Sequence, residues 1–192
     1  MALSNAVLFP HSLLPLHIFE QRYREMLSHT LDGDRMFSVA LIKPGIEEAS
    51  GLGDLCPVAG VGLIRACVGN ENGTSNLVLQ GLVRVRLLES IQERPFRVVR
   101  VELLQSILGN LIEADALSAK VVELCARLEE LGVPLPPNLM DHLQQIESPE
   151  ILSDVVSAAF VSEPSQRQQL LEAHEVGERL RLLIQFLRIQ AG

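Results

Sequence analysis

Two histidines and a glutamate near the start of the chain are of the residue types that bind transition metals. They are His11, His17 and Glu20, and they fall within a stretch of ten residues. His17 and Glu20 stand on either side of a change from strand to helix, so their spacing does not bring them to one face. We interpret all three as polar groups of a turn and a helix start, and the sequence predicts no metal site.

The cysteines give no further ligand set. Cys56, Cys67 and Cys125 are odd in number, widely spaced and set among apolar residues, and the chain has no CxxC pair. Disulfide frameworks and structural zinc sites need an even or closely spaced set of thiols. The pattern is typical of reduced, buried thiols in a cytoplasmic protein.

Motifs for nucleotide or peptide-bond chemistry are missing from the sequence. No glycine is followed by lysine, which excludes a GxxxxGK[ST] phosphate loop, and neither HExxH nor GxSxG occurs. The only lysines are Lys43 and Lys120, and neither lies in a setting that resembles a serine–lysine catalytic pair. The sequence therefore predicts no catalytic residue, no bound cofactor and no enzyme activity.

Charged residues of both signs alternate along two predicted neighbouring strands and the segment between them. They are four arginines and three glutamates, namely Arg84, Arg86, Arg97, Arg100, Glu89, Glu93 and Glu102. The arginines could form a basic face that binds RNA, or they could pair with the glutamates on a solvated sheet face. Residues 109–192 hold six basic and thirteen acidic side chains, and such an acidic part repels phosphate. We favour paired charges, and nucleic acid is not expected as the principal partner.

Apolar runs and turn residues predict a β-rich first part. Runs suited to strands occupy residues 7–9, 36–42, 58–68, 77–88 and 96–104. Pro10 and Pro15 bracket a turn that we expect to lie outside any sheet, and a helix with Phe19 on its apolar face follows. Three glycines within predicted strands indicate bulges or sharp bends: Gly60, Gly62 and Gly81. Bent antiparallel strands of this kind predict a small barrel, which closes its sheet edges.

From about residue 111 the apolar period becomes helical. One stripe comprises Leu117, Val121, Leu124, Leu128 and Leu131, and Gly132 with the prolines that follow ends this helix. Further helices are predicted at 138–146, 149–161, 164–174 and 175–190, the second of them with Ser148 as its N-cap. The expected fold class is α+β, with a β-rich barrel subdomain at 1–108 and a helical bundle subdomain at 109–192.

Residues 1–19 carry no charge, yet prolines, serines and histidines interrupt them and no basic residue precedes them. This excludes a signal peptide or membrane span of ordinary pattern. The whole chain is 47% hydrophobic and 21% charged, which excludes a mainly disordered protein. We expect a cytoplasmic protein with no membrane partner.

The stretch from Val7 to Met26 reads VLFPHSLLPLHIFEQRYREM. It resembles the opening of the N-terminal substrate-binding (LON, PUA-like) domain of the Lon family of ATP-dependent proteases. Segments that follow the same family in order are VAGVG at 58–62, QGLVRV at 80–85, IESPEILSD at 146–154 and VGERL at 176–180. The resemblance covers nearly the whole chain and implies a PUA-like bent β-barrel with one helix, followed by an α-helical bundle. The family usually has another short strand before this opening, of which only Met1-Ala2-Leu3 remains here, so an edge strand is expected to be incomplete.

The resemblance implies a non-catalytic module that recruits unfolded or damaged polypeptide for protein quality control. The ATPase and serine–lysine protease domains of the family are absent from this sequence, which could be a fragment or a stand-alone relative. Expected partners are therefore client polypeptides, with self-association or an ATPase–protease partner as further possibilities. An RNA-binding PUA-like barrel is the alternative function.

Apolar residues around the proline-bracketed turn are the candidate peptide-binding residues. Leucines are not needed for turn geometry, so Leu13 and Leu14 are the first candidates. Exposed beside other apolar side chains, they would form an adaptable patch for extended polypeptide. The full candidate set is Phe9, Leu13, Leu14, Met26, Met36 and Phe37. The alternative for each of them is a place in the barrel core.

We predict that the purified chain neither hydrolyses ATP nor cleaves an unfolded protein such as casein, because it lacks a phosphate loop and a nucleophile–base pair. Phosphate release and gel-based cleavage assays check this, with an unrelated protein purified in the same way as the control for contaminating ATPase. Turnover that co-purifies with the chain through several columns would contradict it.

Overall fold

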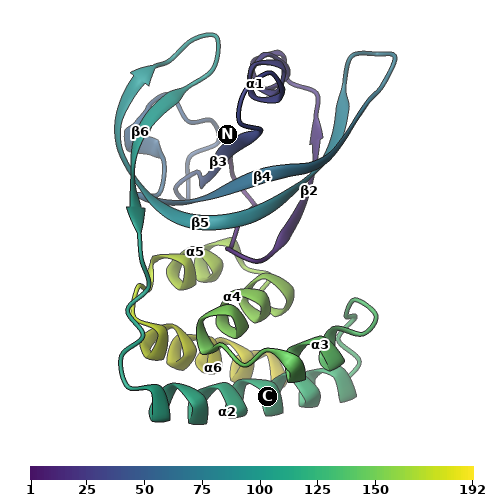
Figure 1. Ribbon diagram of the computed structural model, residues 1–192, viewed down its shortest axis with the longest axis vertical. Helices are drawn as coiled ribbons and strands as arrows, with labels where there is room; N and C mark the ends of the chain where they lie inside the picture. Colours follow the sequence, from purple (N-terminus) through teal and green to yellow (C-terminus); the bar gives the residue numbers. More distant parts are fainter. The chain divides into compact units, whose positions relative to one another are not determined.

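The computed structural model describes residues 1–192, and the chain divides into two compact units, Met1–Leu104 and Gln105–Gly192. Each unit is described by itself below. The boundary expected from the sequence, between residues 108 and 109, lies slightly beyond this division. Unit 1 contains the strands and one α-helix, and unit 2 contains the remaining helices (Figure 1). The expected α+β class is confirmed.

Unit 1 is a strongly bent, six-stranded mixed sheet in the order β1-β3-β4-β5-β2, with β6 also paired to β5. All strand pairs are antiparallel except β1 with β3. The elements are β1 (Ala2–Leu3), β2 (Leu13–Ile18), α1 (Gln21–Leu31), β3 (Met36–Leu41), the 3₁₀ turn η1 (Leu52–Asp54), β4 (Val58–Gly69), β5 (Ser75–Gln92) and β6 (Val98–Leu104). The short β1 lies in the Met1-Ala2-Leu3 segment, where the sequence led us to expect an edge strand.

Residues 7–9 form no strand, although their β-branched and apolar character predicted one. They cross the sheet as an irregular segment that touches the glycines of β4 and β5. A Cβ atom on Gly60 would overlap the carbonyl of Leu8, and one on Gly81 would overlap the carbonyl of Phe9. The predicted irregularity of β4 is confirmed, because its register with β5 shifts between Val61 and Gly62. The glycines therefore serve a close approach of two backbones as well as a bend.

Pro15 lies inside β2, opposite Val78 of β5, so the expectation that it stands outside any sheet is wrong. β2 is the last strand on its path through the sheet, and an edge strand tolerates proline on its unpaired side. The turn is confined to residues 9–12, where His11 has a φ of 62° and the Ser12 hydroxyl donates to the Phe9 carbonyl at 2.7 Å. Leu13 and Leu14 therefore begin a strand.

The core of unit 1 lies between α1 and the concave side of the sheet. Tyr23, Met26, Leu27 and Thr30 of α1 are buried and form the apolar face of this helix. Phe19 was expected on the same face, but it precedes the helix and is 62% exposed. The helix therefore begins two residues later than the sequence suggested.

Unit 2 consists of α2 (Leu111–Glu130), α3 (Leu139–Gln145), α4 (Pro149–Phe160), α5 (Pro164–Glu172) and α6 (Val176–Ala191). Each lies close to the range predicted from the sequence. Ser148 caps α4 as expected, because its hydroxyl accepts from the Ile151 amide at 3.4 Å. Leu131 was expected in the apolar stripe of α2 but follows the helix and is 60% exposed.

An ion pair is completely buried in unit 2. Arg179 of α6 and Asp154 of α4 lie 3.1 Å apart, and neither side chain is exposed. The same guanidinium donates to the Ser153 hydroxyl, the Ala173 carbonyl and the Ser106 hydroxyl at 3.0–3.2 Å. A buried arginine is stable only when its donors are satisfied in this way. It therefore joins α4, α6, the α5–α6 junction and the segment that follows β6.

Replacing Gly60 by alanine is expected to destabilise the chain by about 3 kcal/mol, because the new Cβ would push the Leu8 backbone off the sheet. Gly69→Ala is the matched control in the same strand, since no atom lies within 4 Å of the point that its Cβ would occupy. The control should change stability by less than about 0.5 kcal/mol. Urea unfolding monitored by circular dichroism checks both, and equal effects of the two substitutions would contradict the crossing.

Candidate functional site

Side chains on the convex side of the sheet form three rows in register across neighbouring strands. The first row is Met36, Leu63, Gln80 and Leu13, which are successive partners from β3 to β2. The second row joins Ala66, Val78 and Pro15, and the third joins Val68, Asn76 and His17. Directly opposed residues of antiparallel strands point to the same side. We call these ten residues the outer sheet face.

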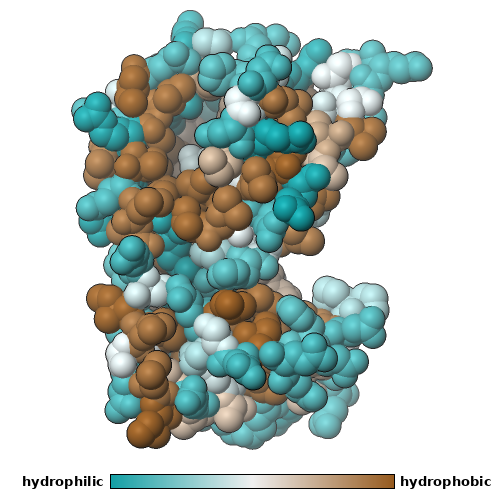
Figure 2. Space-filling model, in the orientation of Figure 1, coloured by the Kyte–Doolittle hydropathy of each residue, from teal (hydrophilic) through white to brown (hydrophobic).

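The outer sheet face is mainly apolar and open to solvent. Leu13 and Val68 are each 65% exposed, and Met36 is 38% exposed. A groove of about 450 Å³ runs over the second and third rows, with Leu16 and Leu77 also in its lining. Figure 2 shows hydrophobic residues gathered over β2 and the neighbouring strands at the right of the view. Several adjoining exposed apolar side chains of this kind mark an interaction surface.

One aromatic side chain extends this apolar surface beyond β2. Phe19 stacks on His17 with ring centroids 6.0 Å apart and an interplanar angle of 21°. The imidazole Nδ1 of His17 lies 2.8 Å from the side-chain oxygen of Asn76, which holds the ring across the β2–β5 pair. The ring that supports Phe19 is therefore itself fixed to the sheet.

The structure separates the six candidate residues into two groups. Leu13 and Met36 lie in the same row of the outer sheet face and are exposed. Phe9, Met26 and Phe37 are buried, at 0%, 5% and 8% exposure. Leu14 is half-buried and packs against the core between the sheet and α1. Phe9, Met26 and Phe37 therefore offer almost no surface to a partner, and a core position describes these three residues.

Sequence reasoning missed most of the outer sheet face. The residues not foreseen are Pro15, His17, Leu63, Ala66, Val68, Asn76, Val78 and Gln80, together with the neighbouring Phe19. A signal was present in β4, where the run LIRACV at 63–68 is apolar at positions of both parities. A strand with one solvated face normally alternates with polar residues. Such a run therefore indicates a second apolar face.

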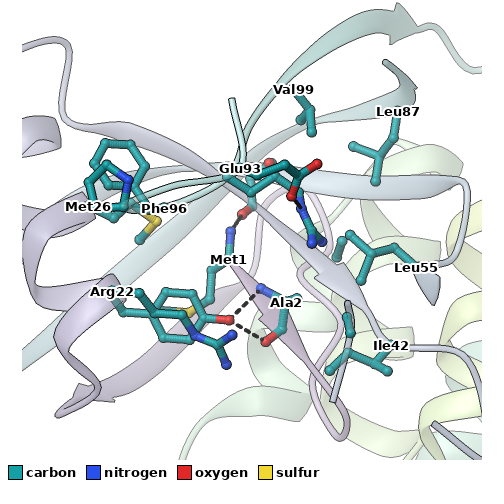
Figure 3. A pocket seen from close by; sticks show the side chains of 16 residues that line it. Met1, Ala2, Arg22, Met26, Ile42, Leu55, Leu87, Glu93, Phe96 and Val99 are labelled. Atoms are coloured by element: carbon teal, nitrogen blue, oxygen red, sulfur yellow. Dashed lines mark hydrogen bonds and ion pairs between the residues drawn. The ribbon is translucent and has the colours of Figure 1, made fainter. Parts of the chain in front are cut away.

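A small cavity of about 90 Å³ lies among β1, β3, α1 and the loop between β5 and β6. Figure 3 shows Met26 and Phe96 on one side of it and Ile42, Leu55 and Leu87 on the other. The Tyr23 hydroxyl accepts from the Ala2 amide at 3.1 Å and donates to the Ala2 carbonyl at 2.9 Å. The cavity is too small for an extended peptide, so the outer sheet face is the better candidate for a polymer ligand.

The α-amino group of Met1 lies at this cavity and donates to the Ser38 carbonyl at 2.7 Å. Burial, together with the positive charges of Arg97 and Arg22, lowers the pKa of this amine to about 5. An amine with this pKa is neutral at pH 7. The α-amino group therefore adds no positive charge to the cavity.

The arginines of β5, β6 and the loop between them do not form a free basic face. Arg86 pairs with Glu102 at 3.0 Å, Arg97 with Glu93 at 2.8 Å and Arg100 with Glu89 at 3.1 Å. Arg84 is only 3% exposed. The predicted interleaving of charges on a solvated sheet is confirmed, and these pairs leave little positive charge for a phosphate backbone.

The residues that suggested a metal site have separate structural roles. His11 is an exposed turn residue with positive φ, and Glu20 binds Arg22 at 2.7 Å. No group of three or more histidine, cysteine, aspartate or glutamate side chains is placed to hold a metal ion. The three cysteines form no disulfide, with Cys56 and Cys125 buried and Cys67 half-buried.

Comparison with known families decides what kind of module this is. The model of the ATP-dependent protease La (LON) substrate-binding domain matches residues 1–188. The chain belongs to this family. The resemblance first seen in the 7–26 segment is confirmed over residues 1–188 of the chain. The match covers the substrate-binding domain, which is non-catalytic, and includes neither the ATPase nor the protease domain of Lon proteases.

Relatives of this LON domain are parts of much longer proteins. It is 28% identical over 189 residues to a Lon protease of Anaeromyxobacter dehalogenans, covering 97% of this chain and 22% of the relative. It is 27% identical over 188 residues to Lon protease 2 of Myxococcus xanthus, covering 97% of this chain and 23% of that one. The chain thus spans less than a quarter of the length of these curated relatives.

Solved structures of the LON domain share the fold. The N-terminal domain of Mycobacterium avium complex Lon protease superposes with a TM-score of 0.74 at 18% identity, covering 98% of this chain and 96% of that one. A Lon N-terminal domain protein from Xanthomonas campestris gives 0.67 at 20% identity, covering 97% and 95%. The helices of this chain lack the combination of length and hydrophobicity that a membrane span requires.

Thiol reactivity is expected to follow burial. Burial raises the pKa of Cys125 to about 12, and its side chain is fully buried, so almost no thiolate forms in the folded chain near pH 8. Iodoacetamide should therefore modify the half-buried Cys67 first and reach Cys125 only in denaturant. Mass spectrometry of labelled peptides checks this order. Native labelling of Cys125 as fast as Cys67 would show that the helical core is open.

Proposed function

We propose that the outer sheet face of this LON domain binds extended apolar segments of unfolded or damaged polypeptide. The observation that carries the proposal is the gathering of apolar side chains on four neighbouring strands: Met36 of β3, Val68 of β4 and Leu13 of β2 are exposed, and Val78 of β5 is half-buried between the last two strands. A folded protein hides such segments, whereas an unfolded one presents them. Membership of a substrate-binding family supports a role in recognising protein substrates.

The surface fits a chain that has little defined structure. The groove beside Val68 and Val78 is apolar over most of its lining, and few polar groups demand a particular hydrogen-bond partner. Recognition therefore rests on burial of apolar area. This burial contributes a free energy of about 25 cal/mol per Å² and does not depend on direction. Such binding tolerates many client sequences.

The affinity of one domain should be weak. A flexible client loses conformational entropy on binding, and the face is shallow, so a dissociation constant on the order of micromolar or weaker is expected. Several copies acting on one client would raise the apparent affinity without new contacts. We propose that a separate or attached ATPase–protease takes up the bound client, since the longer relatives are Lon proteases.

The double substitution Leu13→Ser with Val68→Ser should weaken binding by about tenfold, because each change removes apolar area from the groove and its margin. Fluorescence anisotropy with a labelled, permanently unfolded polypeptide measures this. The folded form of the protein from which this polypeptide derives should bind only weakly.

The matched control is Leu131→Ser with Ile189→Ser, which removes equally exposed side chains (60% and 72%) from unit 2. This variant should bind as the unchanged chain does, and circular dichroism verifies the fold of both variants. Equal binding by all three proteins would remove the outer sheet face from the site. Absence of binding by the unchanged chain at about millimolar concentration would refute the recruiting function itself.

A further inference from the structure

The strand β6 presents an open edge that the other border strands do not. It pairs with β5 on one side only, and the four residues 100–103 are all exposed. β6 is seven residues long, contains no proline, and the irregularities of the pair fall on β5. By contrast, β2 carries Pro15, and β1 has only two residues. Proline and short length protect an edge against strand addition, and β6 lacks both protections.

The sequence of β6 is complementary to itself when it is reversed. In an antiparallel pair of two copies centred on Val101, Arg100 of each copy faces Glu102 of the other. Val99 of each copy then faces Leu103 of the other, and Val101 faces Val101. Opposite charges placed directly opposite stabilise an antiparallel pair, as do β-branched and aliphatic partners. A shift by one residue either way loses both charge pairs, so the register is specified.

Existing ion pairs would extend across such a junction. Within one copy, Arg86 pairs with Glu102, and Glu89 pairs with Arg100. Across the junction, the row would run from Arg86 and Glu102 of one copy to Arg100 and Glu89 of the second copy. The sign of the charge alternates at each step. No like charges face each other anywhere in this row.

The opposite side of the junction would be apolar. Leu87 is the partner of Val101, and Val85 is the partner of Leu103 within one copy. Val85 is fully buried, while Val101 and Leu103 are 37% and 68% exposed. Figure 2 shows hydrophobic residues over the region of β5 and β6 at the left of the view. The buried apolar side chains of β5 thus continue into exposed apolar side chains on β6. A second copy would cover these exposed side chains.

We propose that the chain forms a twofold-symmetric homodimer by antiparallel pairing of β6 with β6 of a second copy, centred on Val101. The occupant of the edge is a second copy because the charge pattern at 100 and 102 matches itself in this one register. The junction is narrow, so the dimer is weak and reversible, with a dissociation constant on the order of tens of micromolar or weaker. This inference concerns an edge that shares no residue with the outer sheet face.

Charge reversal tests the pairing. Arg100→Glu places glutamates opposite each other in a self-pair, and Glu102→Arg places arginines opposite each other. Each variant alone should dimerise at least about tenfold more weakly than the unchanged chain in sedimentation velocity over a concentration series. An equimolar mixture of the two variants should restore dimers, because glutamate then faces arginine at both positions.

Arg65→Glu, at an exposed position of β4, is the matched control for a change of net charge and should leave dimerisation unchanged. Circular dichroism verifies that each variant is folded. A chain that is monomeric up to about millimolar concentration, or a mixture that fails to restore dimers, would overturn the proposal. Client binding measured on the same samples tests the outer sheet face separately.

Cross-linking tests the register even where charge reversal perturbs the fold. Cysteines at position 101 of two copies face each other across the twofold axis, within reach of a disulfide. In a Cys67→Ser background, Val101→Cys should cross-link under mild oxidation, and Leu103→Cys alone should not. A mixture of Leu103→Cys and Val99→Cys should cross-link, since these positions face each other. Cross-linking of Leu103→Cys with itself as readily as Val101→Cys would exclude the proposed register.

Discussion

Two backbones cross at van der Waals distance where residues 8 and 9 pass over β4 and β5, and most of unit 1 depends on this crossing. Gly60 and Gly81 leave the space for the carbonyls of Leu8 and Phe9, and Leu8 then fills the core against Gly62. The Gly81 carbonyl accepts from His11, and its amide donates to Ser12, which begins the pairing of β2 with β5. The register of β2, and with it the direction of Leu13, therefore follows from the crossing.

The features that the sequence predicted well are those with local causes. Ser148 followed by Pro149 is sufficient to start a helix, and the apolar stripe of α6 is sufficient to bury it. The predictions of a strand at 7–9 and of a turn at Pro15 were wrong, because both structures depend on which strand lies beside the segment. Candidate residues such as Leu13 and Phe37 could not be told apart, since their directions depend on sheet register. Asp154 and Arg179 lay in segments that carried the family resemblance, but their pairing joins different helices.

Apolar residues on a sheet surface have different meanings on different sides of unit 1. On the concave side, Leu77 and Leu79 of β5 are covered by α1 and belong to the core. On the convex side, Val78 between them faces solvent with Pro15 and Ala66 beside it. One short stretch of β5 thus contributes both to the core and to the proposed binding surface. The odd-numbered residues of this stretch pack in the core, and the even-numbered Val78 faces outward.

The buried Arg179 also has a consequence for biosynthesis. Its guanidinium reaches Ser106, which precedes it by 73 residues, and α6 supplies Val176, Leu180, Leu183 and Leu187 to the centre of unit 2. At roughly 5–20 residues per second, a ribosome needs about 4–15 s to travel from one partner to the other. During this interval α2 and α4 are synthesised before the helix that covers them, whereas every strand of unit 1 is already complete. The helical half therefore cannot complete its core until α6, the most C-terminal of its five helices, has been synthesised.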